Sequence, residues 1–176
     1  MRAFHLRVAE AVRPDFAARR AFYASPLAGR ALTESRATSR LVLESARFGA
    51  VLTFFASRDD AGLAEQRLEP LQAELGPAQS SFGEFTRRYD LIGAVVGSIR
   101  VTSPAAGAPA LVALGRGDPA PAVPGQSTLF VARLRSDDGW EGLVHVASAR
   151  PPDQWEDAEF FERFVVAHVD RGDAMP

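Results

Sequence analysis

The chain has no cysteine, no lysine and no asparagine among its 176 residues. Without cysteine it forms no disulfide, no zinc–thiolate site and no iron–sulfur cluster, and it has no cysteine nucleophile. All 20 basic residues are therefore arginines, a bias that fits the codon usage of a GC-rich genome. Any anion site in this chain must then be built from planar guanidinium groups rather than from ammonium groups.

An excess charge of one sign and long apolar runs are also missing. The formal net charge is −2, so no basic surface is expected and nucleic acid is not a predicted partner. No run approaches the roughly 18 apolar residues of a membrane span, and the first residues lack the apolar core of a signal peptide. We therefore expect a soluble, cytoplasmic protein with no membrane partner.

Local patterns predict an α+β protein. Alternation of apolar and polar residues is typical of strands, and apolar residues three or four apart are typical of helices. Pro26 and Pro70 are expected to end or kink the helices that contain them, residues 76–90 have a loop-like composition, and "ALVALG" predicts a short helical or extended piece. The predicted strands cover residues 1–12, 39–45, 49–57, 91–101, 128–134 and 141–148, and the predicted helices cover residues 14–32, 58–75 and 151–169.

The second predicted hairpin resembles the first. "SRLVLES" matches "STLFVAR" at an offset of 88 residues, and "AVLTFFAS" matches "EGLVHVAS" at an offset of 91 residues. Each hairpin precedes a predicted helix with acidic residues near its start, which indicates duplication of a β-α-β-β-α unit. The alternative is that short strands resemble one another in any α+β protein. The predicted halves are residues 1–85 and 86–176, the second with a Pro/Gly-rich segment at 103–126.

The stretch "LVLESARFGAVLTFFASRDDAGL" is similar to the dimeric α+β barrel superfamily, which includes antibiotic-biosynthesis monooxygenase-like domains. This resemblance implies two tandem ferredoxin-like halves whose antiparallel sheets pack face to face as a fused barrel, and it allows a homodimer. It also implies a small-molecule-binding barrel, in one form a cofactor-independent monooxygenase-like enzyme acting on an apolar or aromatic ligand. The alternative is a non-catalytic ligand-binding or protein-interaction module.

Histidine and arginine on the predicted strands are the candidate catalytic residues. His5 and Arg7 share one face of the first strand, and His145 occupies the position matched by Phe54 in the first hairpin. If the apolar side of the first strand packs on the helices, His5 and Arg7 face the barrel interior, where His5 could act as a general base. The alternatives are an exposed rim for His5 and Arg7, and a core position for His145.

Aromatic and charged residues elsewhere are candidates for lining a ligand pocket, since such pockets combine apolar walls with few polar groups. Ordinary packing or a solvated rim is the alternative for each of them. The spacing of the histidines matches no metal motif, and His168 is expected to be structural. No cofactor is predicted. A haem-binding barrel with a histidine ligand ranks third, after the enzyme and the non-catalytic module. The candidate ligand-binding residues are Trp140, Tyr89, Arg133 and Glu44.

Overall fold

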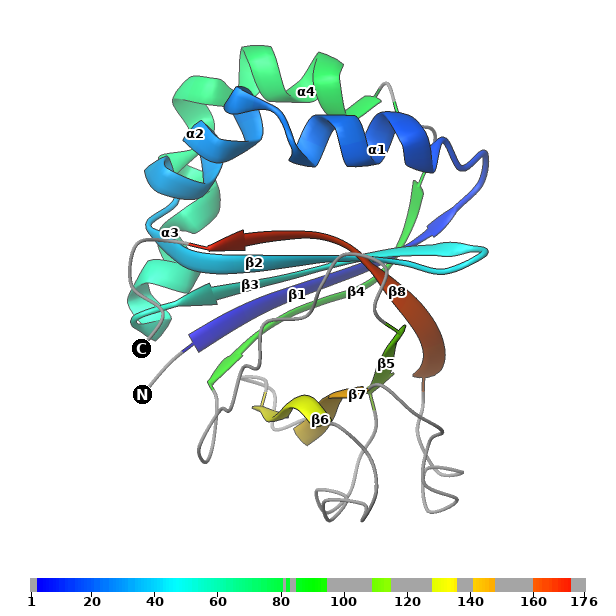
Figure 1. Ribbon diagram of the computed structural model, residues 1–176. Helices are drawn as coiled ribbons and strands as arrows, with labels where there is room; N and C mark the ends of the chain where they lie inside the picture. The colour runs from blue at the N-terminus through cyan, green and yellow to red at the C-terminus, as the bar shows by residue number, and fades with distance from the viewer. Residues whose placement is uncertain are drawn as a thin grey trace.

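Helices cover one face of an antiparallel sheet in the computed structural model (Figure 1). The structure describes residues 3–80, 82, 85–94, 109–114, 128–135, 141–147 and 160–171. The protein is therefore α+β, as predicted. Its elements in chain order are β1 (Ala3–Ala11), α1 (Phe16–Tyr23), α2 (Pro26–Glu34), β2 (Ala37–Glu44), β3 (Phe48–Phe55), α3 (Arg58–Arg67), the 3-10 helix η1 (Glu69–Leu71), α4 (Gln72–Ser80), β4 (Phe85–Ala94), β5 (Pro109–Leu114), β6 (Thr128–Arg135), β7 (Glu141–Ala147) and β8 (Phe160–Arg171).

Side-chain caps and prolines explain where the helices begin and end. The carboxylate of Asp15 accepts from an amide in the first turn of α1, and the hydroxyls of Ser25 and Ser57 do the same for α2 and α3. Pro26 occupies the first turn of α2, where its missing N–H costs nothing. Pro70 lies in η1, between α3 and α4. The predicted breaks at both prolines are confirmed.

Six strands form the main sheet in the order β4-β1-β3-β2-β8-β5, and every neighbouring pair is antiparallel. Residues 3–94 alone contribute four of these strands and all four α-helices, in the element order of a split β-α-β motif. The predicted hairpin of β2 and β3 is confirmed, with Leu41 opposite Leu52. The predicted second hairpin is confirmed as the separate pair β6 and β7.

The prediction of a helix over residues 151–169 is wrong, because residues 160–171 form the strand β8. Residues 151–159 lie outside the described part of the chain. In β8, Phe164 and Val166 are buried while Val165 between them is 48% exposed. This run of phenylalanines and valines fits a strand as well as a helix, and pairing with β2 and β5 decides between them.

The remaining predictions of local structure are met in part. Strand β4 begins at Phe85 rather than at residue 91, and α4 extends to Ser80 into the region predicted as loop. Residues 95–101 lie outside the described residues, whereas the "ALVALG" piece is extended in β5. The described part of the second half contains no helix, and β8 belongs to the same sheet as β1 to β4. Tandem ferredoxin-like halves are therefore not confirmed.

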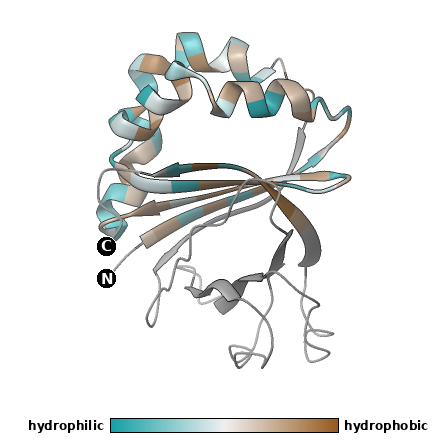
Figure 2. Ribbon diagram, in the orientation of Figure 1, coloured by the Kyte–Doolittle hydropathy of each residue, from teal (hydrophilic) through white to brown (hydrophobic). Residues whose placement is uncertain are grey.

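The sheet buries its apolar side on the face opposite the helices. Polar and apolar residues alternate along its strands, so that one face of the sheet is more polar and the other more apolar (Figure 2). Figure 1 shows β6 and β7 on the side opposite the helices. Ten described side chains on this face are each at most 4% exposed. Its residues are Phe4, Leu6, Val8, Leu41, Leu43, Ala50, Leu52, Phe54, Phe164 and Val166.

No described helix is long and apolar enough to cross a membrane.

Candidate functional site

Two adjoining hollows lie between the helices and the sheet, and we call them together the helix–sheet cavity. One has a volume of about 130 Å³ and the other about 320 Å³. Four residues line both hollows, which therefore lie side by side: Arg7, Tyr23, Val51 and Gln79. The shared wall comes from β1, β3, α1 and α4, and residues of β2, α2 and α3 also line the smaller hollow.

His5 and Arg7, two of the three predicted catalytic residues, line this cavity. They lie on the face of β1 that the helices cover, because Phe4 and Leu6 point to the opposite, buried face. The condition that the apolar side of β1 packs on the helices is therefore not met, and His5 and Arg7 face a cavity on the helix side instead. Arg7 Nη2 donates to Glu65 Oε1 of α3 at 2.5 Å, and both side chains are exposed at the rim.

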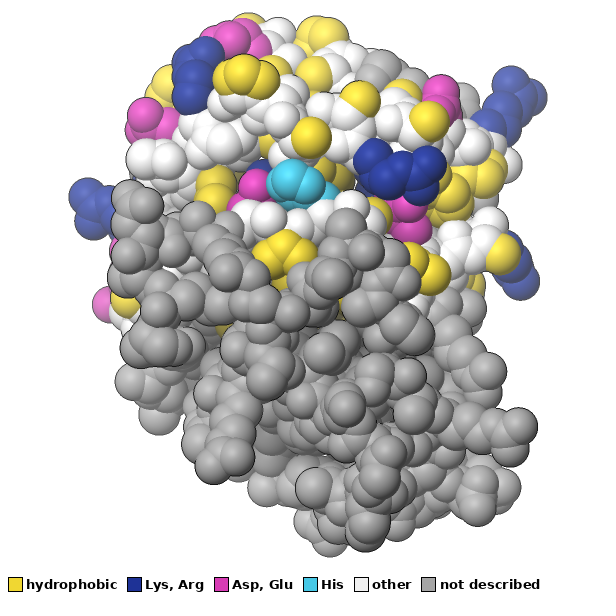
Figure 3. Space-filling view, in the orientation of Figure 1, with side chains coloured by type: hydrophobic (Ala, Val, Ile, Leu, Met, Phe, Trp, Pro, Cys, Tyr) yellow, Lys and Arg dark blue, Asp and Glu magenta, His cyan; other side chains and the backbone are white. Residues whose placement is uncertain are grey.

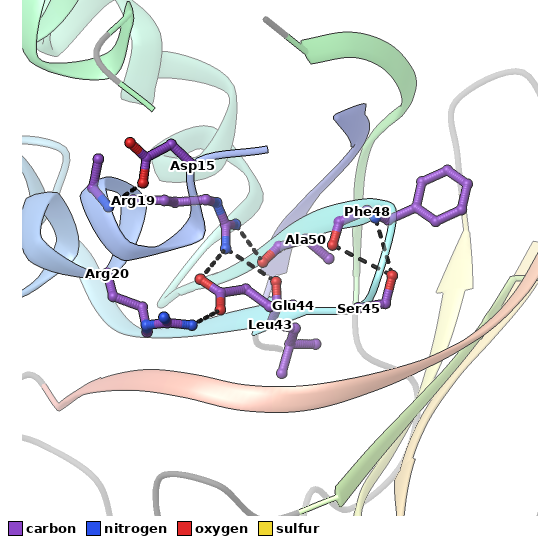
Figure 4. A network of polar contacts seen from close by, with 9 residues as sticks. Asp15, Arg19, Arg20, Leu43, Glu44, Ser45, Phe48 and Ala50 are labelled. Carbon is purple, nitrogen blue, oxygen red and sulfur yellow. Dashed lines mark hydrogen bonds and ion pairs between the residues drawn. The ribbon is translucent and has the colours of Figure 1, made fainter. Parts of the chain in front are cut away.

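Arg19 of α1 is a second arginine in the cavity wall, and it is only 3% exposed. Its Nη1 donates to the carbonyl of Leu43 at 3.1 Å and to the carboxylate of Glu44 at 3.4 Å, and its Nη2 donates to the carbonyl of Ala50 at 3.1 Å. Figure 4 shows the side chain reaching from the helix onto the β2–β3 hairpin. A Cβ atom at Gly49 would lie 3.0 Å from this guanidinium group. Glycine at position 49 thus allows Arg19 to lie against the strand.

Tyr23 lines both hollows and has two guanidinium groups near its ring. The Cζ atoms of Arg19 and Arg40 lie 5.2 and 4.8 Å from the centre of its ring, within cation–π range. Arg40 is held in turn by Asp170 of β8, 2.5 Å from its Nη2, and Asp170 also lies 2.9 Å from Nε2 of His168. Figure 3 shows arginine, acidic and histidine side chains along the seam between the helices and the sheet.

Arginines and carboxylates form ion pairs that line or adjoin the cavity. Among the described side chains, Glu44 pairs with both Arg19 and Arg20. Guanidinium groups bind carboxylates and phosphates in a bidentate manner, so these arginines are candidates for contacting an anionic group that enters the cavity. The pairs are Arg7–Glu65, Arg19–Glu44, Arg20–Glu44 and Arg40–Asp170.

The other predicted site residues are not brought together at this cavity by the described structure. Glu44 is buried and acts as an anchor for α1, through its ion pairs with Arg19 and Arg20. Three others are placed by backbone pairing alone: Tyr89 opposite Val8, Arg133 opposite Leu143, and His145 opposite Val131. Trp140 lies outside the described residues.

Sequence reasoning missed Arg19, Tyr23, Arg40 and Gly49. Arg19 falls within a predicted helix and Arg40 within a predicted strand, positions at which arginine is usually solvated. One signal was available: Arg40 and Glu44 share a strand face with the apolar Val42, which indicates that this face is covered by another part of the protein. The pairing of Arg40 with Asp170, 130 positions later in the chain, had no local signal.

Comparisons with protein families, with curated proteins and with solved structures find no match to this chain. Among the described side chains, no three histidine, aspartate or glutamate residues lie close enough together to hold a metal ion.

Proposed function

We propose that this protein binds a small organic molecule in the helix–sheet cavity. The observation that supports this most strongly is an open space of about 320 Å³ beside a buried arginine. Ligand pockets have volumes of about 300–1,000 Å³ and combine apolar walls with a few polar groups. The hollow is open to solvent, so a ligand can enter it directly.

The walls favour a ligand with a flat apolar part. Phe22, Tyr23 and Phe82 form an aromatic cluster at one side of the cavity, with ring centres 5.0–6.5 Å apart. Val51 and Leu75 add aliphatic surface. Aromatic rings stack or meet edge to face at such distances, and an aromatic ligand would extend the same packing.

Titration with N-phenyl-1-naphthylamine, a neutral fluorescent probe, tests this proposal. We expect saturable binding to the wild-type protein, and binding at least about tenfold weaker to Val51→Phe, because Val51 lines both hollows and the larger ring fills them. Val165→Phe is the matched control: this strand valine is 48% exposed and lines neither hollow. Equal affinity of the probe for wild type and Val51→Phe would contradict the proposal.

A cofactor-independent monooxygenase-like activity is a second candidate, supported by His5 and Arg7 lining one hollow. In this proposal His5 accepts the hydroxyl proton of a ligand such as 1-naphthol, and Arg7 stabilises the resulting anion. Dioxygen then oxidises that anion: one oxygen atom is added to the ring to give the naphthoquinone, and the other leaves as water with the proton from His5 and the displaced ring hydrogen. Uptake of dioxygen with bound 1-naphthol, lost in His5→Gln, is the expected result. Binding of 1-naphthol with no dioxygen uptake would argue for the non-catalytic ligand-binding alternative.

We also propose that the chain folds as a fused barrel. This is supported by the β-α-β-β-α-β order of residues 3–94 and by the burial of apolar side chains on the sheet face away from the helices. The strand β8, which replaces the expected final helix, is the point at which the chain departs from two equal ferredoxin-like halves.

A further inference from the structure

We infer that the ligand of the helix–sheet cavity carries a carboxylate or similar anion, and that the Nε side of Arg19 binds it. This inference rests on the proposed function, since it names the ligand class of the same cavity. It goes beyond the binding of a small molecule by assigning an anion to one edge of one guanidinium group.

The hydrogen bonds of Arg19 leave part of its guanidinium group unused. A guanidinium group has five N–H bonds. Nη1 donates to two acceptors and Nη2 to one, so that within the described residues the Nε–H and one hydrogen of Nη2 have no protein acceptor. The side chain is 96% buried (4% exposed). Buried N–H groups need an acceptor, and those of a charged group need one most.

Gly49 determines how the guanidinium group of Arg19 lies in the larger hollow, which both residues line. A Cβ atom at position 49 would come within 3.0 Å of Cζ and Nε and 3.1 Å of Nη2. Nearly equal distances to these three atoms place that Cβ over the flat face of the group, so the missing side chain lets the guanidinium lie against the strand, and residue 49 does not cover the N–H groups in its plane. Nε and Nη2 together form one of the two-pronged edges with which arginine binds a carboxylate.

The surroundings of this edge support an amphipathic ligand rather than an isolated ion. Tyr23 and Phe82 line the same hollow and provide aromatic surface for the apolar part. Arg7 lies at the rim of both hollows, paired with the exposed Glu65. The chemical class that fits is an aromatic carboxylate with its anionic end at Arg19.

Calorimetric titration with 2-naphthoate and its neutral counterpart 2-naphthamide tests the inference. The two probes share a ring system and differ in charge. We expect wild type to bind naphthoate at least about tenfold more tightly, as a charge-assisted hydrogen bond provides. In Gly49→Ala, whose new Cβ would come within 3.0 Å of Cζ and Nε and so displace the guanidinium group, we expect this preference to fall to about threefold or less. Gly62→Ala is the matched control, because no atom lies within 4 Å of a Cβ at that position.

The outcomes separate this inference from the proposed function. Equal affinity for both probes would overturn the anion assignment and leave small-molecule binding in place. A preference for naphthoate that Gly49→Ala does not change would assign the anion elsewhere and would also overturn it. Binding of neither probe, together with no binding of N-phenyl-1-naphthylamine, would overturn the proposed function itself.

Discussion

Replacing Arg19 by methionine should destabilise the fold by about 3–4 kcal/mol. Methionine keeps much of the length and helix propensity of arginine. The substitution removes the donors to the carbonyls of Leu43 and Ala50 and one of the two partners of Glu44. Breaking a buried ion pair costs about 3–5 kcal/mol when the remaining charge has no partner. The lower part of that range applies here, because Arg20 still donates to Glu44 at 2.6 Å.

Urea denaturation at pH 7 measures this loss, with Arg20→Met as its control. The side chain of Arg20 is 52% exposed, and Glu44 is its carboxylate partner. An exposed or half-exposed arginine contributes about 0–1 kcal/mol through such a pair, so the two substitutions at neighbouring positions should differ by at least about 2 kcal/mol. If Arg19→Met costs no more than Arg20→Met, the buried network is not what anchors α1 on the β2–β3 hairpin.

Two further substitutions test the core and a helix start. Phe4→Ala should cost about 3–5 kcal/mol in urea denaturation, because Phe4 is 0% exposed on the face away from the helices; a cost near 1 kcal/mol would mean that no second layer packs there. The hydrogen bond from Ser57, with help from Arg67, lowers the pKa of Asp60 below its ordinary value of 3.8. Because this pKa is lower in the folded state, the charged carboxylate stabilises the fold at pH values above its ordinary pKa. That stabilisation is lost as the pH falls through the folded-state pKa. The wild type should therefore exceed Asp60→Asn in stability at pH 7 and pH 5, with the difference shrinking towards pH 3; a difference that stays constant with pH would refute the role of the charge.

Strands and helix ends were predictable wherever local chemistry decides them. The alternation of β1, the hairpin of β2 and β3, and the breaks at Pro26 and Pro70 depend on neighbouring residues alone. The identity of β8 depends instead on hydrogen bonds to β2 and β5, which are distant in sequence. An apolar run such as "FFERFVVAHV" is compatible with either structure until its partners are known.

The candidate site was predictable only in part for a related reason. Alternation shows that His5 and Arg7 share a face, but it does not show which layer covers that face. In this protein the helices cover the more polar face, and the apolar face is buried on the other side. The role of Arg19 depends on carbonyls of two strands and on a glycine 30 positions later in the chain. No local pattern in the sequence contains those relations.

Titration of isotope-labelled protein with 2-naphthoate, followed by NMR of the backbone amides and the arginine Nε–H groups, tests ligand binding in the cavity most directly. Binding between the helices and the sheet predicts the largest shifts at the Nε–H of Arg19 and at the amides of Gly49 and Val51, with no shift at Gly62. Largest shifts outside the cavity lining, or saturable binding that leaves Arg19 and Gly49 unshifted, would contradict it.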